Sequence, residues 1–167
     1  VRAVASRAPE ALREMAALGM RFDGGIEAPR LGREGGHGVA RVAHAGGDAT
    51  GFELERSLLM RLPESPSIRP RENLFLVDLL TGDEGEVIGG LFREADGDLE
   101  VIRAGATVLA TGGACQVFRE STNSPVATGD GMAAAFRSGA VLRDLEFVQF
   151  HPTVLYAAGA ARFLITE

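Results

Sequence analysis

The chain has 167 residues, 46% of them hydrophobic, and a formal net charge of −6 at pH 7. This length fits one domain or part of a larger protein, and the acidic balance argues against a general nucleic-acid-binding protein. No apolar run approaches the roughly 18 residues that a membrane span needs, and the single cysteine, Cys115, allows no internal disulfide and favours a reducing, cytoplasmic compartment.

The first elements are a helix and a loop. Leu12 and Met15 recur at helical spacing and predict a helix over residues 8–18, with Gly19 as its C-cap. The segment that follows, residues 23–38, is polar and rich in glycine, and therefore predicts a loop.

A strand and a second helix are expected next. Residues 39–45, VARVAHA, are a short strand candidate, and residues 48–62 have helical spacing. Thr50 and Glu53 have the spacing of a capping box at the start of this helix, and Pro63 is expected to stop it.

The period of the apolar residues changes after residue 70. Strand-like runs over residues 73–80, 85–94 and 98–113 are separated by the turn segments TGDEG and ADGD. They predict a β-meander that adjoins or leads into a more buried strand, ATVLA. A helix over residues 129–140 follows, so the elements together predict a mixed α/β (α+β) fold.

The segment EFVQFHPTVLY, residues 146–156, is expected to form a further strand. Because side chains alternate faces in an extended chain, Gln149 and His151 would share one face while Val148 and Phe150 take the other. Two polar groups would then point at the same target.

Two segments have features of a ligand site. TVLATGG, residues 107–113, ends an apolar run in a glycine turn, which lets a ligand approach the backbone; a plain tight turn is the alternative. Residues 129–134, GDGMAA, match the dinucleotide fingerprint formally, but no strand precedes them, so we reject that interpretation. Asp130 is either an ordinary acid at a helix start or an acceptor for a ribose hydroxyl.

Other chemistry finds less support. In REGGHG, residues 33–38, charged groups surround paired glycines and could face a ligand, although a solvated loop is the simpler interpretation. The single cysteine is far from any histidine pair and no HxxxH spacing occurs, so we expect no zinc site. No G-x-S-x-G elbow is present for a Ser-His-Asp triad. The chain begins at Val and ends without a polar tail, so we expect a fragment of a longer protein.

Taken together, these segments resemble one group of flavoproteins. REGGHG, HAGGDATG, VLATGG, TNSPVATGDGMAAAFRSGA, LEFVQFHPTVLY and RFLITE occur in the same order in the succinate dehydrogenase and fumarate reductase flavoproteins and their L-aspartate oxidase branch. The resemblance covers essentially the whole chain. An acid at Glu34, where the respiratory members usually carry an aromatic residue, is similar to the oxidase branch.

The resemblance implies an FAD enzyme that oxidises L-aspartate to iminoaspartate, in de novo NAD synthesis, with oxygen or fumarate as the electron acceptor. It implies a partial FAD-binding, Rossmann-like domain over residues 1–144 and the start of a substrate-capping domain over 145–167. It leaves open a partner such as quinolinate synthase and the oligomeric state.

The resemblance also implies the roles of single residues. The substrate-binding residues would be Glu34, Gln149, His151, Thr166 and Glu167. The FAD-binding residues would be Gly35, Gly36, Ala110, Thr111, Gly112, Gly113, Asn123 and Asp130.

Several parts of such a site are missing from the 167 residues. These are the N-terminal G-x-G-x-x-G unit, the Ser/Gly-rich flavin cradle and a catalytic Arg expected downstream. We therefore expect this polypeptide alone neither to hold FAD tightly nor to turn over. Two alternatives stay open, namely a succinate dehydrogenase or fumarate reductase flavoprotein subunit and a non-catalytic truncated remnant.

Overall fold

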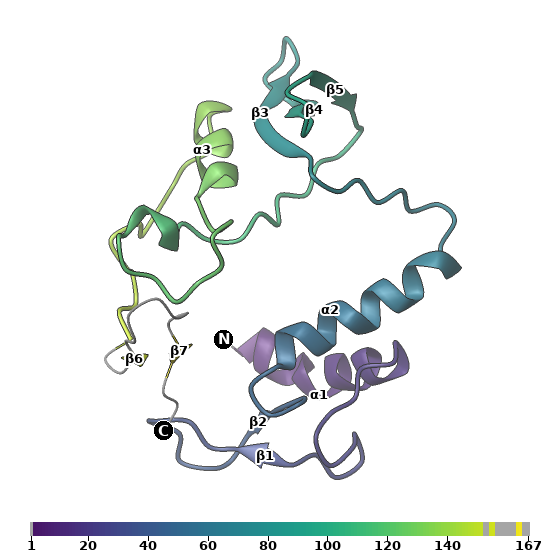
Figure 1. Cartoon of the computed structure of the whole chain (residues 1–167), viewed down its shortest axis with the longest axis vertical. Coiled ribbons are helices and arrows are strands. Elements are labelled where there is room, and N and C mark those ends of the chain that lie inside the picture. The colour runs from purple at the N-terminus through teal and green to yellow at the C-terminus, as the bar shows by residue number, and fades with distance from the viewer. Residues whose placement is uncertain (1, 152–153, 156–162, 165–167) are drawn as a thin grey trace. The chain divides into compact units, whose positions relative to one another are not determined.

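The computed structural model describes residues 2–151, 154–155 and 163–164. It divides into two units, which are described separately: unit 1 runs from Val1 to Pro70 and unit 2 from Arg71 to Thr166. Both contain helices and short antiparallel strands (Figure 1), which confirms the predicted mixed fold class.

Unit 1 contains two helices and a minimal hairpin. Helix α1 spans Arg2–Ala17 and helix α2 spans Thr50–Arg61, followed by the 3-10 turn η1, Leu62–Glu64. Helix α1 begins six residues earlier than predicted and carries Pro9 in its interior, where the sequence suggested a helix start. The predicted end is confirmed, because Gly19 adopts a positive φ of 99° just beyond it.

The core of unit 1 is a small cluster between these helices. Met20, Phe22 and Ala45 are buried, and Met15 of α1 and Leu54 of α2 are among the apolar residues packed against them. The apolar face predicted from the spacing of α1 is therefore the face that packs.

The predicted capping box at the start of α2 is wrong. The N-cap residue is Ala49, and the Thr50 hydroxyl accepts the Ala45 N–H at 3.1 Å instead of capping the helix. The Glu53 carboxylate accepts the Arg21 N–H at 2.9 Å and binds the Arg56 guanidinium. Other partners, of which only Arg21 is distant in sequence, thus take both groups that a cap would have used.

The glycine-rich loop contains a strand that the sequence did not suggest. Strand β1, Leu31–Gly32, pairs with β2, Val42–Ala43, in an antiparallel ladder. Strand β2 is shorter than the predicted 39–45. The Arg41 N–H donates to the Gly32 carbonyl at 2.9 Å and closes the hairpin loop, so REGGHG lies in that loop.

Unit 2 begins with the predicted meander. Strands β3 (Phe75–Thr81), β4 (Val87–Arg93) and β5 (Leu99–Arg103) form an antiparallel sheet in the order β3-β4-β5. Two irregularities interrupt the β3–β4 register, between Leu76 and Asp78 and between Leu80 and Thr81. All three strands lie within the runs that the spacing of apolar residues after residue 70 predicted, to within one residue.

The second half of unit 2 departs from the predictions. ATVLA, residues 106–110, forms no strand and is exposed, with Val108 at 89%. A buried strand needs partner strands on its edges, and the described part of unit 2 offers this segment none. After the 3-10 turn η2, Cys115–Val117, helix α3 spans Asp130–Arg137, within the predicted 129–140.

The predicted strand over residues 146–156 is wrong for most of its length. Residues 146–151 form no strand, whereas Val154–Leu155 forms β6, which pairs with β7, Phe163–Leu164; residues 152, 153 and 156 lie outside the described residues. Asp144 has a φ of 61° and its carbonyl accepts the Phe147 N–H, so a turn precedes the segment. Residues 147–151 follow without ladder partners.

Candidate functional site

The first turn of α3 packs directly against the glycine turn of TVLATGG. The Gly129 N–H donates to the Gly113 carbonyl at 3.1 Å, and Gly129 has a φ of 83°. At the start of the helix, the Thr128 hydroxyl donates to the Asp130 carboxylate. The two segments predicted to contact a cofactor are therefore neighbours in space.

The close packing of α3 on the glycine turn depends on Gly131, which is also a glycine of the formal dinucleotide fingerprint. A Cβ on Gly131 would overlap the Thr111 side chain, and Ala134, one turn later, is fully buried. The formal fingerprint over residues 129–134 thus reflects close packing of α3 on the Ala110–Gly113 segment. The absence of a preceding strand, on which we rejected the fingerprint, is confirmed.

The Ala110–Gly113 segment has the geometry that a flat or phosphorylated ligand requires. A Cβ built on Gly112 or Gly113 would meet nothing within 4 Å, so space is open beside this backbone. Thr111 and Asp130 both line a cavity of about 560 Å³, whose other walls come from the meander and residues 104–109. Open backbone beside a carboxylate fits FAD, which presents a planar ring, phosphates and ribose hydroxyls.

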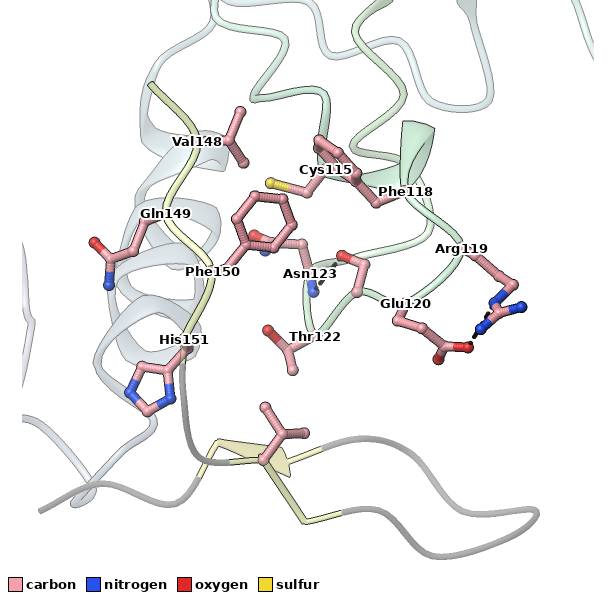
Figure 2. Close-up of a pocket in the computed structure, with 12 residues that line it drawn as sticks. Cys115, Phe118, Arg119, Glu120, Thr122, Asn123, Val148, Gln149, Phe150 and His151 are labelled. Carbon is pink, nitrogen blue, oxygen red and sulfur yellow. Dashed lines mark hydrogen bonds and ion pairs between the residues drawn. The ribbon is translucent and has the colours of Figure 1, made fainter. Parts of the chain in front are cut away.

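A second cavity of about 500 Å³ collects three more of the predicted residues (Figure 2). Asn123 lies in its wall on one side, and Gln149 and His151 lie on the other. In Figure 2, Val148 and Phe150 point toward Cys115 and Asn123, whereas Gln149 and His151 project from the opposite side of their segment. The alternation predicted for these residues is therefore retained without a strand ladder.

Aromatic and backbone contacts fix the walls of this cavity. The Phe118 and Phe150 rings meet edge to face, with centroids 5.1 Å apart. The Gln116 side-chain amide donates to the carbonyls of Asn123 and Ser124 at 2.9 and 3.1 Å. A larger groove of about 960 Å³ shares Asn123 and His151 with this cavity and extends along α3 to Met132.

Glu34, Gly35 and Gly36 lie in unit 1, in the β1–β2 hairpin loop. The His37 N–H donates to the Glu34 carbonyl at 3.0 Å, and the Arg33 Nε donates to the His37 carbonyl at 2.7 Å. These two bonds form a tight turn that holds Glu34 and His37 together. Glu34 is half-buried.

The base of this hairpin is held by a second acid. Both oxygens of the Asp23 carboxylate accept backbone N–H groups, from Gly46 and Gly47, at 3.0 Å each. The Gly47 and Gly46 hydrogen bonds lower the pKa of Asp23. The segment HAGGDATG, which the resemblance included, thus serves a structural role at this position.

Glu53 is the most perturbed acid in unit 1. The hydrogen bond from Arg56, followed by that from the Arg21 N–H, lowers the pKa of Glu53 to about 2. Arg56 also donates to the Gly19 carbonyl at 3.1 Å. These bonds tie α2 to the end of α1, outside any residue predicted to bind a ligand.

Of the predicted residues of unit 2, Thr111 and Asp130 line one cavity and Asn123, Gln149 and His151 line another, whereas Ala110, Gly112 and Gly113 line neither. The predicted residues of unit 1 lie in one loop. Thr166 and Glu167 lie outside the described residues. Cys115 and Phe118 line the cavity in Figure 2 and were not predicted. Phe118 had a signal, since it is a large apolar residue between glycine- and serine-rich turns.

Two searches of the described residues returned nothing. Within residues 2–151, 154–155 and 163–164, no group of three His, Cys, Asp or Glu side chains is placed to hold a metal ion. Over the same ranges, no helix is long and apolar enough to cross a membrane.

The chain is similar to known flavoproteins along its whole length. It is 46% identical to the L-aspartate oxidase of Streptomyces coelicolor, covering 96% of this chain and 28% of that relative. It is 44% identical to the chloroplastic L-aspartate oxidase of Arabidopsis thaliana, over 100% of this chain and 28% of the relative. The chain therefore spans little more than a quarter of the length of these relatives.

Solved structures agree in fold. The E. coli quinol fumarate reductase matches with a TM-score of 0.82 at 36% identity, over 90% of this chain and 26% of that one. Sdh1 of Mycobacterium smegmatis matches with a TM-score of 0.77 at 34% identity, over 89% and 27%. The model of the FAD binding domain family matches residues 1–167. The chain belongs to this family of FAD-binding domains.

Proposed function

We propose that this chain is part of an FAD-dependent oxidoreductase that converts L-aspartate to iminoaspartate, with oxygen or fumarate as the final electron acceptor. The observation that carries the proposal is its 39–46% identity to proteins named L-aspartate oxidase, which extends over nearly the whole chain. The arrangement of open glycine backbone, Asp130 and a polar-lined cavity supports it. FAD, when bound, accepts the hydride from the substrate carbon.

Each predicted residue then has a task. Gln149 and His151 bind a carboxylate of the substrate, since an amide and an imidazole project together from the side of their segment opposite Val148 and Phe150. Glu34 faces the substrate ammonium, which a carboxylate stabilises and which succinate lacks. The residues proposed to hold FAD are Gly35, Gly36, Ala110, Thr111, Gly112, Gly113, Asn123 and Asp130, and Thr166 and Glu167 complete the substrate side.

The proposal extends to the setting of the enzyme. Residues 1–144 belong to the FAD-binding domain and 145–167 begin a capping domain over the substrate. The oxidation of L-aspartate would be the first step of de novo NAD synthesis, which makes quinolinate synthase a candidate partner. A single cysteine is compatible with work in a reducing compartment such as the cytoplasm.

A second candidate function is that of a succinate dehydrogenase or fumarate reductase flavoprotein subunit. The fold similarity to the E. coli quinol fumarate reductase, at a TM-score of 0.82, favours it. Glu34 argues against it, because a half-buried carboxylate would repel a dicarboxylate substrate that has no ammonium.

The test is an assay of the full-length, FAD-loaded protein with L-aspartate against succinate. We expect L-aspartate to be oxidised and succinate to be a poor substrate. In the Glu34→Phe variant we expect kcat/KM for L-aspartate to fall about 10- to 150-fold, because a charge-assisted hydrogen bond contributes roughly 1.5–3 kcal/mol. The matched control is Glu27→Phe, an acid outside the hairpin loop. Unchanged aspartate turnover in Glu34→Phe would remove the role given to Glu34.

A further inference from the structure

The hairpin loop that carries Glu34 also holds a group that the proposed function leaves unused. His37 follows Glu34 by three residues, within the same turn. Its backbone is held on both sides, since its N–H donates to the Glu34 carbonyl and its carbonyl accepts the Arg33 Nε. The backbone of His37 is therefore fixed relative to that of Glu34 by the loop itself.

The imidazole has an unusual environment for a polar group. The His37 Nδ1 is buried and has no hydrogen-bond partner among the residues that the structure describes. Buried polar atoms nearly always have a partner, and an exception points to a missing ligand or a reactive role. An unpaired ring nitrogen, in the same turn as a carboxylate residue, is a suitable acceptor for a cation that carries several N–H groups.

Oxidation of an amino acid creates a need for such an acceptor. An α-ammonium has no free electron pair, so it must lose a proton before hydride can leave the α-carbon and an imine can form. A carboxylate binds the ammonium well but is a weak base, whereas imidazole ordinarily exchanges a proton near neutral pH. The loop supplies one of each.

We propose that the His37 Nδ1 accepts a hydrogen bond from the α-ammonium of the substrate, beside Glu34, and takes its proton before hydride transfer. The N–H bond of the ammonium breaks, its electron pair stays on nitrogen, and the proton moves to Nδ1. Hydride then leaves the α-carbon for the flavin and the product is an iminium ion, which loses a further proton to become iminoaspartate. The proposal rests on the proposed function, of which it assigns the base.

The charged residues within this turn are Arg33 and Glu34. The Arg33 guanidinium binds the His37 carbonyl and not the ring, while Glu34 would share the ammonium with His37. The proton therefore passes between the substrate and the imidazole, and Glu34 serves to bind.

The test uses three variants of the full-length, FAD-loaded protein. Asn places an amide oxygen near the position of Nδ1 and keeps an acceptor without a base; Gln places its amide near Nε2; Leu keeps neither. We measure kcat and KM for L-aspartate from pH 5.5 to 9.5, and the inhibition constant of succinate, which has no ammonium.

In His37→Asn we expect KM to stay within about 3-fold of the wild type while kcat at pH 7 falls about 10²- to 10⁴-fold, the usual contribution of a general base. The remaining rate should rise about tenfold per pH unit, as free amine appears in solution. His37→Gln and His37→Leu should lose kcat equally and also raise KM. Succinate inhibition should change by less than about 3-fold throughout.

Three outcomes overturn the proposal. Retention of kcat in His37→Asn would show that no base acts there. Weaker succinate inhibition in all three variants would show that the ring only shapes the loop. An unchanged acid limb of the pH profile in His37→Asn would assign that limb to another group. The wild-type protein distinguishes the role proposed for His37 from the proposed function. A wild-type protein that does not oxidise L-aspartate would contradict the proposed function itself.

Discussion

The two halves of unit 2 are held together by different interactions. The meander, Phe75–Arg103, satisfies its backbone with its own three strands. The half from residue 104 to 151 contains one short helix and leaves large apolar side chains exposed, with Val141 at 92% and Phe147 at 78%. Nearly all of the candidate site residues of unit 2 lie in this second half.

This difference has a physical cause. A meander needs only local antiparallel partners, so a short chain can complete it. The second half is held by the close approach of small residues, by one aromatic pair and by an ion pair to the meander. We infer that substitutions in the second half act on the ligand site, whereas substitutions at meander positions that neither line the cavity beside Thr111 nor contact α3 act on stability alone.

The largest expected effect is at His151. In full-length protein, His151→Ala should raise KM for L-aspartate about 10- to 150-fold, because a lost charge-assisted hydrogen bond to a carboxylate costs roughly 1.5–3 kcal/mol. Val101→Ala on β5, half-exposed in the meander, is the matched control and should leave KM unchanged. Steady-state kinetics of both variants decide the matter. Equal KM values in the two variants would contradict the inference that the ligand site lies in the second half of unit 2.

The same contrast explains which predictions from the sequence succeeded. The meander was predicted because its strands and turns alternate over short distances, and its partners are adjacent in sequence. The segment ATVLA has equal strand propensity but forms no strand, because propensity cannot supply a partner. The side-chain alternation at Gln149 and His151 was predicted correctly, since it needs only an extended chain.

The capping box at Thr50 failed for a related reason. Its spacing was correct, but Ala45 and Arg56 took the hydroxyl and the carboxylate. The i,i+3 spacing of Glu53 and Arg56 is a local ion-pair pattern that competed with the cap, whereas the bond between Ala45 and Thr50 follows no helix motif. Likewise the buried nitrogen of His37 has no sequence signal beyond a histidine among glycines.

The packing of α3 on the glycine turn gives the next prediction. Gly131→Ala would force its new Cβ onto the Thr111 side chain, and overpacking typically costs about 1–3 kcal/mol. We expect a lower Tm and a protein purified with markedly less than one FAD per chain, measured from flavin absorbance. Gly105→Ala is the control, because a Cβ there meets nothing within 4 Å. Full FAD content in Gly131→Ala would mean that this contact does not shape the site.

A smaller effect is expected from the aromatic pair in the cavity wall. Phe118→Leu removes the edge-to-face contact with Phe150, which contributes about 0.5–1.5 kcal/mol beyond the buried area. The free energy of unfolding should fall by that amount, and a double-mutant cycle with Phe150→Leu should return a coupling of the same size. Phe136→Leu, a largely exposed ring on α3, should change stability less. A coupling near zero would leave the cavity wall without its proposed support.

The smallest effect tests the link between the two halves. The Arg137 Nε binds an Asp78 oxygen at 3.0 Å, and Arg137 also donates to the Val77 carbonyl at 2.9 Å, so the last turn of α3 is tied to β3. Both side chains are partly exposed, and a double-mutant cycle of Asp78→Asn with Arg137→Met should give about 0.2–1 kcal/mol.

The coupling between Asp78 and Arg137 should depend on pH in one direction. The hydrogen bond from Arg137 is the main cause that lowers the pKa of Asp78. The stabilisation is therefore fully present above the ordinary aspartate range and is lost as the pH falls through the lowered value. The control pair is Arg71 and Glu100, whose side chains are joined at 2.6 Å on the meander side.

The same ion pair should also affect FAD binding if it connects the two halves of unit 2. In that case Asp78→Asn should weaken FAD binding measurably, while Glu100→Gln should not. Equal FAD affinity in both variants would show that the ion pair contributes to stability only.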